Sequence, residues 1–165
     1  MQTKHQRIAY LHGLHSSPKP KKVAILQQYS QGKVYAPQLD YDDNPQLFEE
    51  IFEACRTQPV DFIVGSSAGG LLGFWLAQHL GLPALLFNPP LYKSEFIQRP
   101  ALKTTAPAFF CQIIQGARDE VVSPEETRDY LQAEVKEAYY AIEILDSLAH
   151  QIDMATFRQT CAKYL

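Results

Sequence analysis

Short apolar runs alternate with longer amphipathic segments along this 165-residue chain, and the alternation limits the folds open to it. The runs predict six strands, at residues 8–11, 34–36, 61–64, 84–87, 109–114 and 140–145. Between them, apolar side chains at three- and four-residue spacing predict helices at 21–29, 45–55, 71–80, 124–135 and 153–164. The expected fold is therefore of the α/β class: a three-layer α/β/α sandwich around a mostly parallel sheet of about six strands.

Two of these helices have recognisable start sequences. Asn44 is expected to cap the second helix, with Pro45 at its first position. The Ser-Pro-Glu-Glu segment at 123–126 is a capping box, so a helix is expected to begin there. Residues 91–107 include two prolines and show no clear period, which predicts an irregular surface excursion.

Composition narrows the class of protein. Net charge is −3, which argues against nucleic-acid binding through bulk positive charge. Cys55, Cys111 and Cys161 are far apart and form no CxxC pair, as is typical of reduced, mostly buried thiols in a cytosolic protein. No stretch approaches the ~20 apolar residues of a membrane span, and no signal peptide fits the N-terminus. We expect a soluble, cytoplasmic, single-domain protein over residues 1–165, with neither nucleic acid nor membrane as a partner.

The Gly-Ser-Ser-Ala-Gly-Gly segment at 65–70 lies between a predicted strand and a predicted helix. It contains G-x-S-x-G, and a serine on such a sharp turn is held exposed as a nucleophile. Ser67 is therefore a candidate nucleophile, and the amide of Ala68 a candidate oxyanion donor. A plain glycine-rich turn with Ser67 as the helix cap is the structural alternative. A P-loop is excluded because no Lys-Ser/Thr pair follows, and the G-x-G-x-x-G fingerprint of dinucleotide binding is absent. No residue of the sequence is assigned to a cofactor or a metal.

Two further candidates follow later strands. Asp119 comes after the fifth predicted strand and His150 after the sixth. A histidine suits the role of general base because its pKa lies near neutral pH, and an acid can orient it. The order Ser67, Asp119, His150 is the nucleophile, acid, base order of α/β-hydrolases, and the carboxyl ends of parallel strands meet at one edge. The alternative is a solvated turn aspartate and a surface histidine.

The turn after the first strand supplies a second oxyanion donor in this interpretation. His-Gly-Leu at 12–14 matches the HG-type turn of α/β-hydrolases, which places the donor at the Leu14 amide, paired with Ala68. His12 itself is expected to have a structural role, satisfying local backbone groups. His15, next in the turn, is a candidate for the pocket lining.

Substrate contacts are less constrained by the sequence. Lys19, Lys21 and Lys22 lie near the start of a predicted helix, where lysines oppose the helix dipole. They either bind an anionic substrate tail or form a solvated face, and the solvated face is favoured. Tyr92 and Phe96 are candidates for the pocket walls, with the protein core as the alternative.

Several segments taken in order resemble the small bacterial YqiA/YcfP-type esterases of the α/β-hydrolase superfamily. They are YLHGLHSSPKPKK, VYAPQL, IVGSSAGGLLGFWLA, LPALLFNPP and GARDEVV. The resemblance implies a minimal α/β-hydrolase fold and ester hydrolysis through Ser67, Asp119 and His150 without a cofactor. The sequence departs from the family at A-H-Q-I, where G-x-H-x-F is more frequent. The segment between Pro90 and Phe109 is short, which implies little or no lid.

The expected function is that of a serine hydrolase that cleaves small carboxylic esters or thioesters through an acyl-enzyme intermediate. A perhydrolase or a carbon–carbon hydrolase would use the same three residues. The alternative from another class is a non-catalytic α/β-hydrolase-fold protein that binds a ligand or partner. Neither the physiological substrate nor the oligomeric state follows from the sequence.

Overall fold

The sheet of this protein is parallel throughout. The computed structural model describes residues 4–93, 95, 97, 100 and 108–165. Within these residues, six strands form one sheet in the order β2-β1-β3-β4-β5-β6, and each of the five pairings is parallel. The strands are β1 (Ile8–Leu11), β2 (Val34–Tyr35), β3 (Phe62–Ser66), β4 (Pro83–Phe87), β5 (Phe110–Gly116) and β6 (Tyr140–Leu145).

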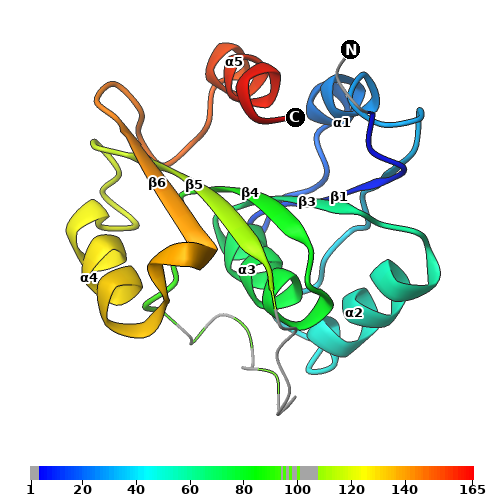
Figure 1. Cartoon of the computed structure of the whole chain (residues 1–165), viewed down its shortest axis with the longest axis horizontal. Coiled ribbons are helices and arrows are strands. Elements are labelled where there is room, and N and C mark those ends of the chain that lie inside the picture. Colours follow the sequence, from blue (N-terminus) through cyan, green and yellow to red (C-terminus); the bar gives the residue numbers. More distant parts are fainter. Residues whose placement is uncertain (1–3, 94, 96, 98–99, 101–107) are drawn as a thin grey trace.

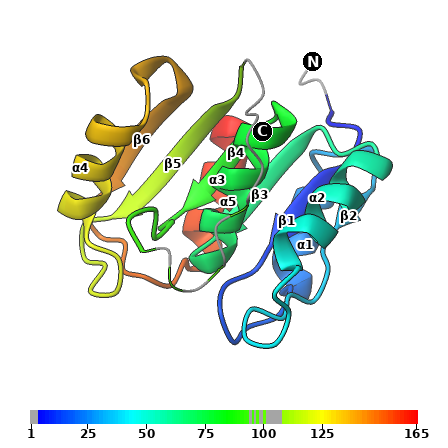
Figure 2. The same cartoon turned by 90° about the horizontal axis from the view of Figure 1, so that it is seen from below.

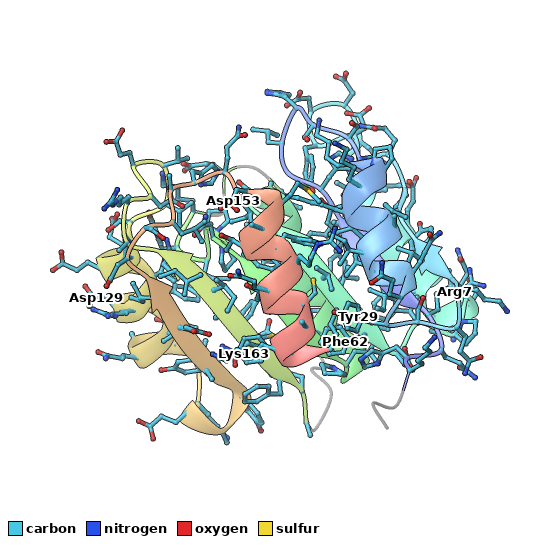
Figure 3. All side chains as sticks on the ribbon, turned by 90° about the horizontal axis from the view of Figure 1, so that it is seen from above. Arg7, Tyr29, Phe62, Asp129, Asp153 and Lys163 are labelled. Carbon is cyan, nitrogen blue, oxygen red and sulfur yellow. The ribbon has the colours of Figure 1, made fainter. Side chains whose placement is uncertain are left out.

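Helices cover both faces of the sheet, so the predicted three-layer sandwich is confirmed. Figure 1 shows α1 and α5 above the sheet and α2, α3 and α4 below it. Figure 2 shows the lower face and Figure 3 the upper one, where α5 runs from Asp153 toward Lys163. The helices are α1 (Pro20–Gln27), α2 (Leu47–Thr57), α3 (Ala68–Leu80), α4 (Pro124–Glu134) and α5 (Met154–Tyr164), with a short 3-10 helix, η1 (Glu137–Tyr139).

The apolar core is divided by the sheet into two clusters. One packs α2, α3 and α4 against the lower face, with Leu71, Leu72 and Leu76 of α3 fully buried. The other packs α1 and α5 against the upper face, centred on Phe157. Since β1, β3 and β4 are buried on both faces, their continuous apolar runs are as expected for central parallel strands.

The predicted start of α2 is wrong. The helix begins at Leu47 rather than Pro45, and Gln46 occupies the capping position without a side-chain cap. Asn44 instead forms a turn of its own, in which its Oδ1 accepts from the Gln46 N–H at 3.0 Å. An asparagine can bond its own backbone two residues on, and that local turn competes with capping.

The predicted start of α4 is confirmed, but only half of the capping box forms, because the Ser123 N–H donates to the Tyr92 hydroxyl and not to Glu126. Ser123 Oγ accepts from the backbone N–H of Glu126, and Pro124 opens the helix. The irregular excursion predicted for 91–107 falls mainly on undescribed residues. Its described residues, 91–93, 95, 97 and 100, lie in neither helix nor strand. The expectation of little or no lid concerns the same segment and lies largely outside the described residues.

The three cysteines are buried and free, as predicted. Burial raises the pKa of the Cys161 thiol to about 12, so this sulfur stays protonated at neutral pH. None of the helices in the described part of the chain has the length and apolar character needed to cross a bilayer.

Candidate active site

Ser67 stands at the sharp turn between β3 and α3. Its backbone φ is +54°, a conformation that residues other than glycine rarely adopt. The Ser67 N–H donates to the Phe87 carbonyl at 2.9 Å, which fixes the turn against β4. Its side chain makes no capping hydrogen bond to α3. The interpretation of Ser67 as a helix-capping serine is therefore wrong, and its hydroxyl is turned toward other groups.

Glycine is required beside this serine because backbones meet there. A Cβ placed on Gly69 would lie 2.1 Å from the Leu11 carbonyl oxygen at the end of β1. A Cβ on Gly65 would lie 2.2 Å from the Gly69 carbonyl oxygen. Real atoms do not approach so closely, so the turn closes only with glycine at both positions.

The three residues expected to act together do meet. Ser67 Oγ lies 3.0 Å from His150 Nε2, and His150 Nδ1 lies 2.8 Å from Asp119 Oδ2. The Asp119 side chain is fully buried, and its other oxygen accepts from the N–H groups of Val121 and Val122, both at 2.8 Å. Because Nδ1 faces a carboxylate, we assign the imidazole proton to Nδ1, which leaves Nε2 to accept the Ser67 proton.

Asn88 holds this arrangement from the end of β4, and sequence reasoning missed it. It is fully buried with a φ of +45°. Its Nδ2 donates to the carbonyls of Ala149 and His150, at 3.0 and 2.8 Å, while its Oδ1 accepts from the Gly116 N–H at 2.7 Å. One side chain thus links the ends of β4 and β5 to the loop that carries His150. The sequence signal that could have indicated Asn88 is the Asn-Pro-Pro segment directly after a predicted strand.

The turn after β1 packs against Ser67. A Cβ on Gly13 would lie 3.3 Å from the Ser67 Cβ, so the two turns touch. Leu14 and Ala68 both line the pocket at this point. Within the part of the chain that the structure describes, neither of their amides donates to another group. Both N–H groups are therefore free to bind a ligand oxygen.

His12 shapes that turn, and its predicted structural role is confirmed. It is 1% exposed, and its Nε2 accepts from the Leu39 N–H at 2.8 Å. Its Nδ1 lies 2.8 Å from the Gly13 carbonyl, so Nδ1 carries the proton of a neutral ring. Burial lowers the pKa of His12, with a further contribution from the positive charge of Lys19.

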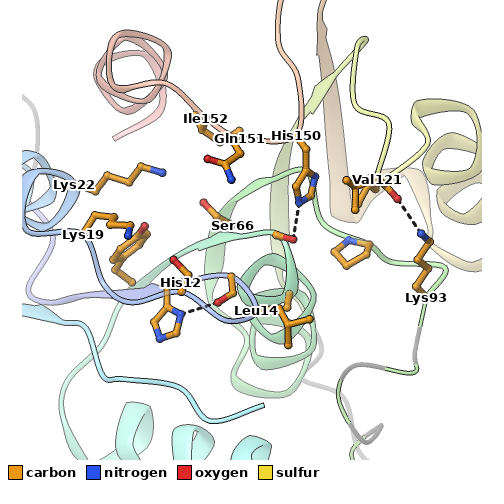
Figure 4. A pocket seen from close by; sticks show the side chains of 17 residues that line it. His12, Leu14, Lys19, Lys22, Ser66, Lys93, Val121, His150, Gln151 and Ile152 are labelled. Carbon is orange, nitrogen blue, oxygen red and sulfur yellow. Dashed lines mark hydrogen bonds between the residues drawn. The ribbon is translucent and has the colours of Figure 1, made fainter. Parts of the chain in front are cut away.

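A pocket of about 380 Å³ opens in front of Ser67 and His150. Figure 4 shows Lys19 and Lys22 on the side away from His150, with Ser66 and Gln151 between. Lys93 lies on the other side and donates to the Val121 carbonyl at 2.8 Å. Among the residues that the structure describes, the lining includes these three lysines but no aspartate or glutamate.

The other predicted lining residues lie elsewhere. His15 points away and pairs with Asp42, its Nε2 2.7 Å from Oδ2, and both side chains are largely exposed. The Tyr92 hydroxyl accepts from the Ser123 N–H at 2.8 Å and supports the start of α4. Neither is part of the pocket lining. Phe96 lies outside the described residues, and Lys21 is exposed and outside the pocket.

Among the described residues, no group of three or more His, Cys, Asp or Glu side chains is arranged to hold a metal ion. No residue set described here is therefore assigned to a metal or cofactor.

Comparison with known proteins identifies the fold. Residues 7–103 match the model of a family described as uncharacterised protein family UPF0227. SOBER1 of Arabidopsis thaliana superposes with a TM-score of 0.69 at 16% identity, over 95% of this chain and 96% of that one. A carboxylesterase of Bacillus cereus gives 0.65 at 16% identity, over 99% and 89%. XC6422 of Xanthomonas campestris, an α/β serine hydrolase without a lid, gives 0.57 at 19% identity, over 89% and 74%. The expected α/β-hydrolase fold is confirmed.

Proposed function

This chain belongs to the uncharacterised protein family UPF0227, and we propose that it is a serine hydrolase that cleaves small carboxylic esters or thioesters. The observation that carries the proposal is the unbroken hydrogen-bonded chain from Ser67 through His150 to Asp119. Supporting it are the positive φ of Ser67, which fits a sharp strand-to-helix turn, and two amides beside it that make no turn or loop hydrogen bond among the described residues. A hydroxyl, a base and a buried acid in this order are the parts that acyl transfer needs.

In the first half of the reaction, Ser67 Oγ attacks the acyl carbonyl carbon while His150 Nε2 takes the serine proton. Asp119 stabilises the imidazolium that forms and keeps its proton on Nδ1. The carbonyl oxygen becomes an oxyanion, which the amides of Leu14 and Ala68 bind. When the tetrahedral intermediate collapses, the carbonyl re-forms, the bond to the leaving oxygen or sulfur breaks, and that atom takes the proton from His150.

The second half uses water in place of the serine. His150 removes a proton from the water as its oxygen attacks the acyl-enzyme carbonyl, and the same two amides bind the new oxyanion. The bond to Ser67 Oγ then breaks, His150 returns the proton to that oxygen, and the carboxylic acid leaves. Each cycle consumes one ester and one water and needs no redox partner.

A fluorophosphonate tests this proposal, because it phosphonylates activated serines. We expect one adduct, located by peptide mass at Ser67 and absent in Ser67→Ala. Asp119→Asn and His150→Ala should label roughly 10³- to 10⁴-fold more slowly, since each removes a part of the base. Ser147→Ala, an exposed serine outside the pocket, is the control and should label as the wild type does.

The same experiment separates the rival function. A folded protein that carries no label at Ser67 would contradict hydrolysis and favour a non-catalytic α/β-hydrolase-fold binding protein. Circular dichroism of each variant shows that the fold is intact. Hydrolysis of p-nitrophenyl butyrate by the same variants, in the same order of rates, completes the test.

A further inference from the structure

The pocket is positively charged in a protein whose net charge is negative. The chain carries a net −3, yet the lining residues in the described part of the chain include three lysines and no carboxylate. Asp119, the acid that pairs with His150, is fully buried and is not among the described lining residues. A concave site lined by one sign of charge attracts the opposite charge. The charge of the pocket therefore needs its own explanation.

Two of the lysines lie together without an ion-pair partner. Lys19 precedes α1 and Lys22 lies in its first turn, where positive charge opposes the helix dipole. Neither forms an ion pair with any residue that the structure describes. Lys22 is partly buried, with its Nζ 5.1 Å from the centre of the Phe157 ring, and burial lowers its pKa. The charge of Asp153 acts on Lys22 and raises its pKa, but the two form no ion pair, and the Asp153 carboxylate accepts from the N–H and hydroxyl of Thr156.

Two hydroxyls that line the same pocket also lack partners. Ser66 Oγ is buried and makes no hydrogen bond within the described residues. Tyr10 is 2% exposed and lines the pocket. Its hydroxyl also makes no hydrogen bond to a described group, but it is not among the buried atoms that lack a partner, so the unpaired buried hydroxyl is that of Ser66. Buried hydroxyls are normally paired, and an unpaired one needs an explanation such as a ligand. Both can donate to a negatively charged oxygen.

We propose that Lys19 and Lys22, with the hydroxyls of Tyr10 and Ser66, form a subsite for an anionic group of the substrate, a carboxylate or a phosphate. This rests on the proposed hydrolase function, because the group is carried by the ester that Ser67 attacks. Lys93 is not part of the subsite, since it already donates to Val121 and lies on the opposite side of the pocket. The natural substrate is accordingly a charged small ester or thioester rather than a neutral lipid.

Direct binding tests the subsite without any need for hydrolysis. Glutarate and glycerol 3-phosphate are titrated into Ser67→Ala and followed by NMR shifts. We expect saturable binding of at least one probe, weakened about tenfold or more when Lys22→Met is added. Lys21→Met is the matched control, because Lys21 is the exposed neighbour outside the pocket, and it should leave binding unchanged. Saturable binding of neither probe, or equal weakening by both substitutions, would overturn the subsite.

Paired esters then connect the subsite to the reaction. The neutral p-nitrophenyl butyrate is compared with mono-p-nitrophenyl glutarate, which carries the anion on the acyl part. In the second pair, acetylated glycerol 3-phosphate carries the anion on the leaving group, and acetylated glycerol is its neutral counterpart. We expect a higher kcat/KM for the charged ester of at least one pair, and a loss of that preference by about tenfold or more in Lys19→Met and Lys22→Met. A preference unchanged by both substitutions would show that the anion site is not a substrate site.

The two proposals fail in different ways. If no ester is cleaved and Ser67 is not labelled, the hydrolase proposal fails, while Lys22-dependent anion binding to Ser67→Ala still supports a binding subsite. If esters are cleaved and Ser67 is labelled but no anion binds, the subsite alone is overturned.

Discussion

Asn88 links three segments that are far apart in the sequence: the end of β4, the end of β5 and the loop that carries His150. Its side chain donates to the carbonyls of Ala149 and His150 and accepts from the N–H at the end of β5. Its own N–H donates to the Ile114 carbonyl at 2.8 Å. Because His150 has no helix or strand to hold it, these bonds determine where its imidazole lies. We therefore assign Asn88 as a positioning residue for the base.

Replacing Asn88 tests that role. Asn88→Asp keeps the side-chain shape but sets a carboxylate against the carbonyls of Ala149 and His150, so we expect fluorophosphonate labelling of Ser67 to slow by about tenfold or more. The pH dependence of labelling should also shift, because a misplaced His150 loses its contact with Asp119. Asn88→Gly, which keeps the positive φ without any side-chain bond, should be slowed similarly. A wild-type rate and pH profile in both variants would contradict the assignment.

His12 makes stability depend on pH. Burial holds its pKa below the unfolded value of about 6.5, since the folded state needs a neutral ring to accept from Leu39. As pH falls, the unfolded chain takes up the proton first. The contribution of His12 is therefore complete above about pH 6.5 and declines as pH falls toward its folded pKa.

Urea unfolding at pH 8, 7, 6 and 5 measures this decline. In His12→Gln, where the amide oxygen can still accept from Leu39 but does not titrate, the fall in unfolding free energy below pH 6.5 should be smaller. His5, whose pKa is also lowered by burial, remains in both proteins and cancels in the comparison. Identical pH slopes would rule out His12 as the group responsible.

At the residue scale, the sequence was informative where the chemical type of the residues and their order along the chain indicated the same site. Ser67, Asp119 and His150 were predicted to meet because each follows a different parallel strand, and they do. His15 was misplaced because the direction of a side chain leaving a turn depends on tertiary contacts, here its pair with Asp42. Asn88 was missed because its partners lie about sixty residues away, where no local pattern refers to them.

At the scale of elements, the backbones of β1 and α3 meet directly at Gly69. We predict that Gly69→Ala lowers the free energy of unfolding by about 3 kcal/mol or more, because its Cβ would meet the rigid backbone of Leu11. Gly73→Ala in the same helix is the control. Its Cβ would meet side-chain methyl groups and no backbone: those of Leu86, Ile63 and Leu11, at 3.0, 3.1 and 3.7 Å. Alanine also favours the helix.

Urea unfolding followed by the fluorescence of the single tryptophan, Trp75, measures both variants. An equal or larger loss of stability in Gly73→Ala would show that the backbone contact with Leu11 is not the reason why Gly69→Ala is destabilising.

Most elements were predictable from periodicity, because buried parallel strands are continuous apolar runs and glycine ends α3 at Gly81. Boundaries were less predictable. The helix after the Ser67 turn begins at Ala68, three residues before its first large apolar side chain, since Ala68, Gly69 and Gly70 are buried by other backbones. In α2 the competing turn at Asn44 moved the start to Leu47.

For the whole molecule, Phe157 joins α5 to the upper face of the sheet. It is fully buried, with ring centres 5.3 Å from Phe87 and 6.3 Å from Tyr10. Phe157→Ala should cost about 3–5 kcal/mol of unfolding free energy, because it leaves a cavity between three elements. Arg158→Ala, at the exposed neighbouring position, should change it by about 0.5 kcal/mol or less. Thermal unfolding by calorimetry checks both values, and a comparable loss in the two would contradict this account of the upper core.

The layer architecture followed from the alternation of elements, whereas the strand order did not. Chain order alone leaves several permutations of six strands, and the choice depends on which crossovers bury the apolar faces of the helices. The composition of the pocket could not be predicted from the sequence either, because its lysines come from the start of one helix and from the segment after β4.

The position of β6 has a consequence for how activity responds to motion. This strand forms the end of the sheet and has β5 as its single neighbour, while the loop it leads into carries His150. Edge segments are the first to open in native-state fluctuations, at a lower free energy than the core. Transient release of β6 would withdraw the base from Ser67 while β1, β3 and α3 stay folded. The reactivity of Ser67 would then be lost in mild denaturant before Trp75 registers any change, so the reactivity of the site reports the opening of this edge of the sheet.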